Sequence, residues 1–234
     1  MKLSEKLFNI LLFTLPLPLS KWFYQITRKV LFPELRKEYF EKIILKAKQI
    51  GTTGDYMEFG VYRGKSMYEF MTVLKKHAMD NCRYYAFDSF QGLPVSEGVT
   101  FSKGEFSYPK NHFEKRMKQS GFPTNRLTVV PGFFEDSLTA ELKKKLPISK
   151  AGFVHIDCDL YESTKVVLNF VEDYIDVGTM LIFDDYFSFD YKENNPENFG
   201  EKKAFNEWKY KNCFEGSFEF PSSKCFIMVK PKTL

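Results

Sequence analysis

The strongest constraint on the fold of this chain is a regular alternation between short apolar runs and segments with a helical spacing of apolar residues. It extends over residues 36–229. The expected strands cover residues 55–61, 83–90, 126–134, 152–160, 178–186, 217–220 and 224–229. The expected helices cover residues 36–50, 64–80, 111–120, 137–146, 163–174 and 201–211. This alternation predicts an α/β domain whose parallel sheet is covered on both faces, with an antiparallel pair at its edge.

The composition excludes several other classes of protein. Of 234 residues, 44% are hydrophobic and 27% are charged, which excludes a disordered chain, a collagen and a multi-span membrane protein. The 34 basic and 30 acidic residues are interleaved and leave a net charge of only +4, so no nucleic-acid partner is expected. The four cysteines lack metal-binding spacing and are interpreted as free thiols in a reducing cytoplasm. The aromatic content of 18% allows either an aromatic core or a pocket for a flat ligand.

The N-terminal residues differ from the rest of the chain. Residues 7–19 form an apolar run that is interrupted by Pro16 and Pro18 and is too short for a transmembrane helix. Basic and aromatic residues follow it up to residue 32. We expect residues 1–35 to form a helical arm that packs on the domain of residues 36–234 or on a second subunit of a homo-oligomer. The alternative is a peripheral membrane contact through residues 1–32.

In a parallel sheet, ligands bind at the carboxyl ends of the strands, so the residues at these ends are the candidates for a site. The first strand ends in an acid-x-Gly-x-x-x-Gly pattern made by Glu58, Gly60 and Gly64. The glycines allow a sharp turn close to a ligand, and the acid suits a cationic group better than a pyrophosphate. Asp88 ends the second strand, where a carboxylate can accept the hydroxyls of a ribose. Each signal alone is also compatible with a purely structural turn.

The fourth and fifth expected strands carry the strongest signal. Asp157 and Asp159 share one face of an extended chain, and Asp184 and Asp185 end the next strand. If these strands are neighbours, their backbones lie about 4.8 Å apart and the carboxylates share one cleft. Like charges this close raise one another's pKa and destabilise the fold unless a cation intervenes. The pattern therefore predicts a Mg²⁺ or Ca²⁺ site rather than a zinc site.

Five segments resemble the macrocin O-methyltransferase-like family of enzymes that depend on S-adenosylmethionine (SAM). They are MEFGVYRGKSM at 57–67, FDSFQGLP at 87–94, PGFFEDSL at 131–138, HIDCDLYEST at 155–164 and LIFDDY at 181–186. The second and fourth segments are quite specific, whereas the glycine pattern is common to Rossmann-like methyltransferases. The resemblance implies a Rossmann-like class I fold, with a mostly parallel seven-stranded sheet and an antiparallel C-terminal hairpin. It also implies Mg²⁺-assisted methylation of a hydroxyl on a sugar, a glycosylated natural product or a glycan.

The resemblance further implies which residues bind SAM. The pocket for its methionine part would be formed by Glu58, Gly60, Tyr62, Gly64 and Ser66. The ribose would be bound by Asp88, with Ser89, Phe90 and Phe134 on the adenine side. Residues 91–109 would form a lid over the cofactor.

The metal and the proton acceptor follow from the same resemblance. Asp157, Asp184 and Asp185 match the ligands of a divalent cation, and Asp157 also borders the cofactor. Asp159 matches the position of the general base. His155 also matches the family, but because it lies within a strand we interpret it as a structural residue.

Three other functions remain open at this point. The acceptor could be a catechol or another phenolic hydroxyl, which the aromatic content mildly favours. A non-catalytic SAM-binding module, associated with a membrane through residues 1–32, would be favoured by the loss of a metal-site acid, but all four acids are present. An NAD-dependent oxidoreductase disagrees with both the glycine spacing and the metal-type acids.

Overall fold

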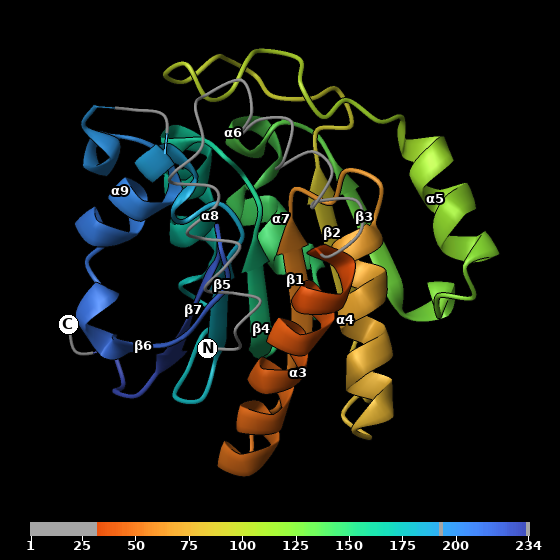
Figure 1. The fold of residues 1–234 in the computed structure, drawn as a ribbon. Helices are drawn as coiled ribbons and strands as arrows, with labels where there is room; N and C mark the ends of the chain where they lie inside the picture. The colour runs from red at the N-terminus through yellow and green to blue at the C-terminus, as the bar shows by residue number, and fades with distance from the viewer. Residues whose placement is uncertain (1–31, 192–193, 233–234) are drawn as a thin grey trace.

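Seven strands form one mixed sheet at the centre of the computed structural model, which describes residues 32–191 and 194–232 (Figure 1). The strands are β1 (Asp55–Phe59), β2 (Tyr84–Asp88), β3 (Leu127–Pro131), β4 (Ala151–Ile156), β5 (Met180–Phe183), β6 (Phe214–Glu219) and β7 (Lys224–Met228). Their order across the sheet is β3-β2-β1-β4-β5-β7-β6. Strands β1 to β5 are parallel, and β7 is antiparallel to both β5 and β6. The expected α/β fold with an antiparallel C-terminal hairpin is confirmed.

Helices cover both faces of this sheet. They are α3 (Phe32–Ile50), α4 (Lys65–Lys76), α5 (Lys110–Gln119), α6 (Phe134–Ser137), α7 (Ala140–Lys145), α8 (Tyr161–Val171) and α9 (Gly200–Glu207). Short 3₁₀ helices lie at Thr124–Arg126, Ser188–Tyr191, Pro196–Asn198 and Lys211–Cys213. Helices α3, α4 and α5 pack in the hydrophobic cluster on one face, and α6, α8 and α9 pack in the cluster on the other. The parallel strands are therefore buried from both sides, as their nearly continuous apolar sequences require.

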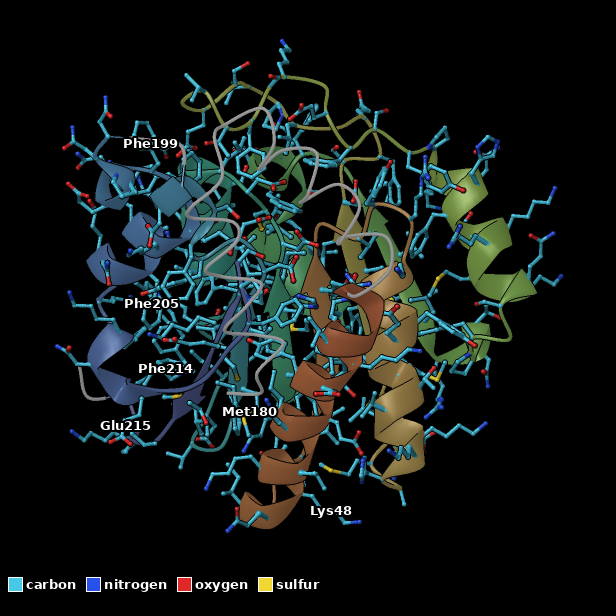
Figure 2. All side chains as sticks on the ribbon, in the orientation of Figure 1. Lys48, Met180, Phe199, Phe205, Phe214 and Glu215 are labelled. Carbon is cyan, nitrogen blue, oxygen red and sulfur yellow. The ribbon has the colours of Figure 1, made fainter. Side chains whose placement is uncertain are left out.

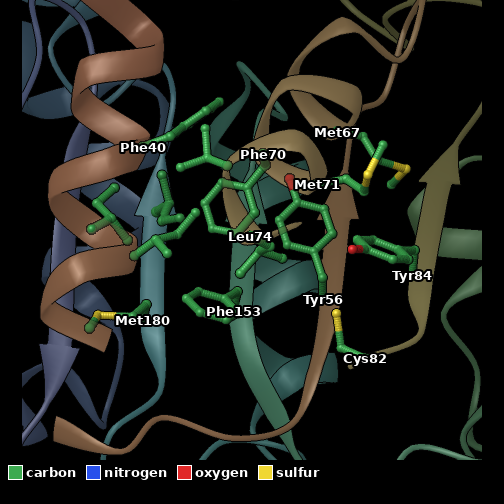
Figure 3. Packing of buried hydrophobic residues seen from close by; sticks show 14 of the residues in the cluster. Phe40, Tyr56, Met67, Phe70, Met71, Leu74, Cys82, Tyr84, Phe153 and Met180 are labelled. Carbon is green, nitrogen blue, oxygen red and sulfur yellow. The ribbon is translucent and has the colours of Figure 1, made fainter. Parts of the chain in front are cut away.

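Many of the aromatic residues are used in these two clusters. Phe40 of α3 and Phe70 of α4 are fully buried and meet edge to face at 5.1 Å, close to Phe153 of β4 (Figure 3). On the opposite face, the rings of Phe205 and Phe214, labelled in Figure 2, lie 6.2 Å apart. Such pairs add about 0.5–1.5 kcal/mol each to the stabilisation from burial. A large part of the aromatic content therefore forms core.

Two differences from the expected helices have a physical cause. The expected helix at 137–146 begins only at Ala140, as α7, because the Thr139 hydroxyl accepts the backbone N–H of Leu142 at 3.2 Å and caps the helix there; Ser137 instead ends the separate helix α6. The expected helix at 64–80 ends at Lys76, and Ala78 has a left-handed φ of 55°. A left-handed residue directly after a helix is a common way to end it.

Helix α3 begins at Phe32 rather than at residue 36, so the last residues of the expected arm belong to it. The remainder of that arm lies outside the described residues, and so does the expected membrane or subunit contact. Among the helices that the structure describes, none has the length and apolar character needed to cross a membrane.

The strand order reverses beside β1, since β2 and β3 lie on one side of it and β4 and β5 on the other. The carboxyl ends of parallel strands next to such a reversal are where ligands bind in open α/β sheets. Residues 89–109, here called the β2–α5 loop, pass over this edge (Figure 1). Phe101 of the loop packs with Leu160 and Phe189, which follow β4 and β5. The loop therefore covers the segments that carry the candidate acids.

Candidate active site

Three carboxylates meet where β4 and β5 end. Asp157 follows β4, and Asp184 and Asp185 follow β5, which lies next to β4 in the sheet. Each side chain offers a carboxylate oxygen within 4.8 Å of the other two. The structure thus brings together the three residues expected to bind a divalent cation. They are called the acid cluster below.

The electrostatics of the acid cluster favour a bound cation. Burial raises the pKa of Asp157 well above its ordinary value, and the charges of Asp184 and Asp185 raise it further. Burial acts in the same direction on Asp184, but His155 and Arg36 outweigh it and lower the pKa of this carboxyl. Compact oxygen donors fit Mg²⁺ or Ca²⁺, whose charge stabilises ionised carboxylates. The residues present therefore fit a divalent cation.

Asp159 lies beside the acid cluster on the segment that leaves β4. It is 6% exposed, and its φ of 62° is uncommon for a residue other than glycine. Burial raises its pKa well above the ordinary value, and the charges of Asp185 and Asp157 raise it further. A carboxylate with a raised pKa accepts a proton more readily near neutral pH, which suits the general base expected at this position.

A buried polar network connects the expected methionine pocket with the acid cluster. Glu58 accepts hydrogen bonds from the hydroxyl of Tyr56 and, at 2.5 Å, from the hydroxyl of Ser66. The imidazole of His155 lies between two acids, 3.7 Å from Glu58 and 3.6 Å from Asp184. Burial lowers the pKa of His155, but the two carboxylates outweigh it and raise this pKa to about 10. His155 is therefore buried between the expected methionine pocket and the acid cluster, and its structural role stays a prediction.

Asp88 holds residues 60–64, which connect β1 with α4 and are here called the glycine loop. One of its oxygens accepts the backbone N–H groups of Val61 and Tyr62 at 2.9 and 2.8 Å, and the other accepts that of Phe90 at 2.6 Å. A carboxylate offers about four acceptor positions, so one is left for a ribose hydroxyl. The position of Asp88 at the end of β2 therefore remains compatible with the expected contact to SAM.

The glycine loop itself is packed tightly against neighbouring segments. Gly64 has a φ of 72°, and a Cβ there would lie 2.6 Å from the sulfur of Met117 in α5. Tyr62 has a positive φ of 44°, and its ring lies 5.8 Å from that of Phe106 and 5.9 Å from that of Tyr108. The β2–α5 loop therefore touches the glycine loop as well as the residues beyond β4.

The three residues expected near adenine already contact other groups of the protein. The hydroxyl of Ser89 donates to the carbonyl of Gly92 at 2.9 Å and so shapes the turn after β2. Phe90 packs near Phe113, and Phe134 packs edge-on against Phe59. Phe90 and Phe134 are only 8% and 9% exposed, which leaves little of either side chain for a ligand.

Three charged residues at this edge were not expected from the sequence. Arg36 of α3 donates to Glu69 at 2.7 Å, and its charge lowers the pKa of Asp184. Glu97 of the β2–α5 loop accepts from the backbone of Gly200, 103 residues away, and Glu201 is fully buried in α9. Acids in loops and in the first turn of helices are common, so the local sequence does not single out Glu97 or Glu201. Arg36 carries no local signal either, because its partner Glu69 is 33 residues away.

Comparison with known sequences identifies a family and related enzymes. A model of the family described as Macrocin-O-methyltransferase (TylF) matches residues 31–208. The 8-demethyl-8-(2,3-dimethoxy-alpha-L-rhamnosyl)-tetracenomycin-C 4'-O-methyltransferase of Streptomyces olivaceus is 27% identical over 146 residues, which are 58% of this chain and 54% of that protein. The chain spans about half the length of the curated relatives it matches.

Solved structures share the fold. The O-methyltransferase NovP superposes with a TM-score of 0.67 at 21% identity, over 84% of this chain and 80% of that one. The calicheamicin methyltransferase CalS11 superposes with a TM-score of 0.66 at 21% identity, over 96% and 91% of the two chains. At this identity the likeness supports the architecture, and the function has to be argued from the site.

Proposed function

The chain belongs to the macrocin O-methyltransferase family, and from this premise we propose that it transfers a methyl group from SAM to a hydroxyl of a sugar, in a glycosylated natural product or a glycan, assisted by Mg²⁺. The observation that carries the proposal is the acid cluster, whose carboxylate oxygens lie within 4.8 Å of one another. The name of the Streptomyces olivaceus relative specifies O-methylation of a rhamnosyl-bearing compound, which supports a sugar acceptor.

The methyl donor would lie across the carboxyl ends of β1 and β2. Gly60, Tyr62 and Gly64 would bring the loop backbone against its methionine part, with Glu58 and Ser66 behind them. Asp88 would accept one ribose hydroxyl in addition to its three backbone hydrogen bonds. Ser89, Phe90 and Phe134 would border the adenine. Because β1 pairs directly with β4, a donor in this position is adjacent to the acid cluster.

The acceptor would be held and activated on the β4–β5 side. Asp157, Asp184 and Asp185 would hold Mg²⁺, which when bound lowers the pKa of an acceptor hydroxyl and fixes its position. Asp159 would take up the hydroxyl proton, because its burial raises its pKa. Methyl transfer is an in-line displacement, so these residues also serve to keep the acceptor oxygen close to the sulfonium carbon.

The β2–α5 loop would act as a lid that excludes water during transfer. Its position over the carboxyl edge and its aromatic contacts with Tyr62 support this role. The loop and the segments after β5 together would then shape the acceptor pocket.

The proposal is tested by assaying methyl transfer from SAM to a panel of glycosides and catechols, with and without EDTA. We expect glycosides to be methylated, chelation to abolish transfer and added Mg²⁺ to restore it. Asp184→Ala should lower transfer at least about a hundredfold, since the metal supplies several kcal/mol. Asp173→Ala, which removes an aspartate that is 61% exposed and paired with Lys143, is the matched control and should retain activity.

Each outcome of this assay is decisive for one part of the proposal. Transfer that persists in EDTA, or in Asp184→Ala, refutes the metal role. Methylation of catechols alone replaces the sugar acceptor with a phenolic one. SAM binding in calorimetry without turnover of any hydroxyl substrate supports a non-catalytic binding module instead.

A further inference from the structure

Glu201 is a fully buried carboxylate whose partners lie on both sides of the acid cluster. One of its oxygens accepts the backbone N–H of Cys158 at 3.0 Å, and the other accepts the backbone N–H of Asp185 at 3.0 Å. Cys158 separates Asp157 from Asp159, and Asp185 is itself a member of the cluster. A single side chain of α9 therefore connects the segment that leaves β4 with the segment that leaves β5.

This connection begins where the sheet ends. The last paired residues of β4 and β5 are Ile156 and Phe183, and one further backbone bond joins the N–H of Asp184 to the carbonyl of Ile156 at 2.9 Å. Beyond that point both segments leave the sheet, and Glu201 supplies an acceptor to each of them. Because both of its bonds end on backbone amides, they set the distance between the two segments that carry the acids.

Glu201 is itself held in a defined position. The preceding residue, Gly200, has a φ of 60°, and a Cβ there would lie 2.7 Å from a ring carbon of Phe189 and 3.1 Å from the carbonyl oxygen of Asp159. The N–H of Gly200 donates to Glu97 of the β2–α5 loop at 2.6 Å. Packing and a hydrogen bond therefore hold the first residue of α9 against the site, which positions Glu201 to bond the amides of Cys158 and Asp185.

We propose that Glu201 is a positioning residue for the acid cluster: by bonding the amides of Cys158 and Asp185, it holds the two acid-bearing segments at the separation that a divalent cation requires. This proposal rests on the proposed function, because it takes the acid cluster to be a cation site. Glu201 is not one of the three carboxylates that form the acid cluster, and it acts on them through the backbone amides of Cys158 and Asp185. Groups that orient metal ligands in this way contribute about 10–100-fold to metal affinity.

The test is the binding of Mn²⁺, a spectroscopic probe for the Mg²⁺ site, to the full chain by electron paramagnetic resonance. Glu201→Asp keeps the charge but is one methylene shorter and cannot span both amides. Glu201→Gln keeps the length but turns one acceptor into a donor that faces an N–H group. We expect each variant to bind Mn²⁺ at least about tenfold more weakly. SAM affinity, measured by calorimetry, should change much less, because the expected SAM pocket lies at β1 and β2.

Glu207→Gln is the matched control, because Glu207 belongs to the same helix and bonds the exposed hydroxyl of Tyr161 rather than the acid-bearing segments. Unchanged Mn²⁺ affinity in Glu201→Gln overturns the inference. Wild-type affinity in Glu201→Asp shows that only the charge matters, and likewise overturns it. Should Glu201→Gln fail to fold by circular dichroism, Glu201→Asp carries the test. A wild-type chain that binds no Mn²⁺ refutes the proposed metal function, which is a separate result.

Discussion

Gly60, in the expected methionine pocket, lies directly against Asp157 of the acid cluster. Its φ is 87°, and a Cβ at this position would overlap the carbonyl oxygen of Asp157 and lie 2.8 Å from its carbonyl carbon. The N–H of Asp157 also donates to the carbonyl of Phe59 at 2.8 Å. The absence of a side chain at Gly60 therefore allows the exit of β1 to contact the first residue of the acid cluster.

We expect Gly60→Ala to destabilise the protein by about 3 kcal/mol or more, because the backbones of β1 and β4 must separate in addition to the strain of a left-handed alanine. Gly121→Ala is the matched control, since Gly121 has a similar φ of 78° and nothing within 4 Å of a Cβ. It should cost only about 1–2 kcal/mol. Urea denaturation measures both variants, and equal losses would show that the contact with Asp157 is unimportant.

The acid cluster and Asp159 also determine how stability depends on pH. Burial and neighbouring charges raise the pKa values of Asp157 and Asp159 well above the ordinary value of 3.8. A group whose pKa is higher in the folded chain contributes stability that is complete below the ordinary pKa and is lost as the pH rises through the folded pKa. In the presence of EDTA, we therefore expect the free energy of unfolding to fall as the pH rises above about 4.

Mg²⁺ should reverse this trend, because a cation binds the ionised carboxylates. The increase in melting temperature caused by Mg²⁺ should be larger at about pH 8 than at about pH 6. Thermal unfolding with Mg²⁺ or EDTA at both pH values measures it. Asp157→Asn removes one of the titrating carboxyls and should reduce the difference. The same Mg²⁺ effect at both pH values would contradict the assignment.

At the level of elements, the β2–α5 loop is attached to two helices by one side chain. Glu97 accepts the N–H of Tyr161, the first residue of α8, at 2.8 Å and that of Gly200, the first residue of α9, at 2.6 Å. Carboxylates bind well at helix N-termini, where backbone donors are free. Glu97 therefore stabilises the first turns of α8 and α9 and holds the β2–α5 loop against both helices.

We expect Glu97→Gln to increase amide hydrogen exchange at Tyr161, Gly200 and residues 91–109 by about tenfold, since a glutamine can accept at only one of the two amides. Glu105→Gln is the control from the same loop, because Glu105 accepts an N–H from Ser102 within the loop at 3.0 Å. Mass spectrometry of exchanged peptides measures both variants. If Glu97→Gln exchanges like the wild-type chain, the loop is held by its aromatic contacts instead.

The elements that could be predicted from the sequence are those with a local signal. The apolar runs that end at Asp157 and Asp184 identify buried parallel strands, and neighbouring strand ends necessarily bring such acids together. The division between α6 and α7 also had a local signal, because a threonine at position 139 is a good N-cap. The roles of Glu97 and Glu201 had none, since their partners are distant in the sequence and are brought close only by the packing of α8 and α9. Their identification needs the three-dimensional structure.

On the scale of the whole molecule, the expected cofactor and metal sites occupy different parts of one edge. Most residues expected to bind SAM lie on β1 and β2 and the segments that follow them, and Phe134 follows β3. The acid cluster follows β4 and β5, with β1 and β4 adjacent in the sheet. The buried connection between them passes through His155, which stands between Glu58 and Asp184 without direct access to solvent. The layout therefore places the residues expected to bind SAM beside the acid cluster, and Asp157 is the residue that the two expected sets share.

From this arrangement we expect SAM to bind without a metal. Chelation with EDTA should change the dissociation constant of SAM by less than about threefold, a small coupling free energy, while it abolishes methyl transfer. Calorimetric titration with SAM, in EDTA and in Mg²⁺, measures the first effect, and Asp185→Asn should reproduce the EDTA result in both measurements. A loss of SAM affinity of tenfold or more on chelation would mean that the cation forms part of the cofactor pocket. In that case Asp157, which borders both sites, is the residue through which the two would be coupled.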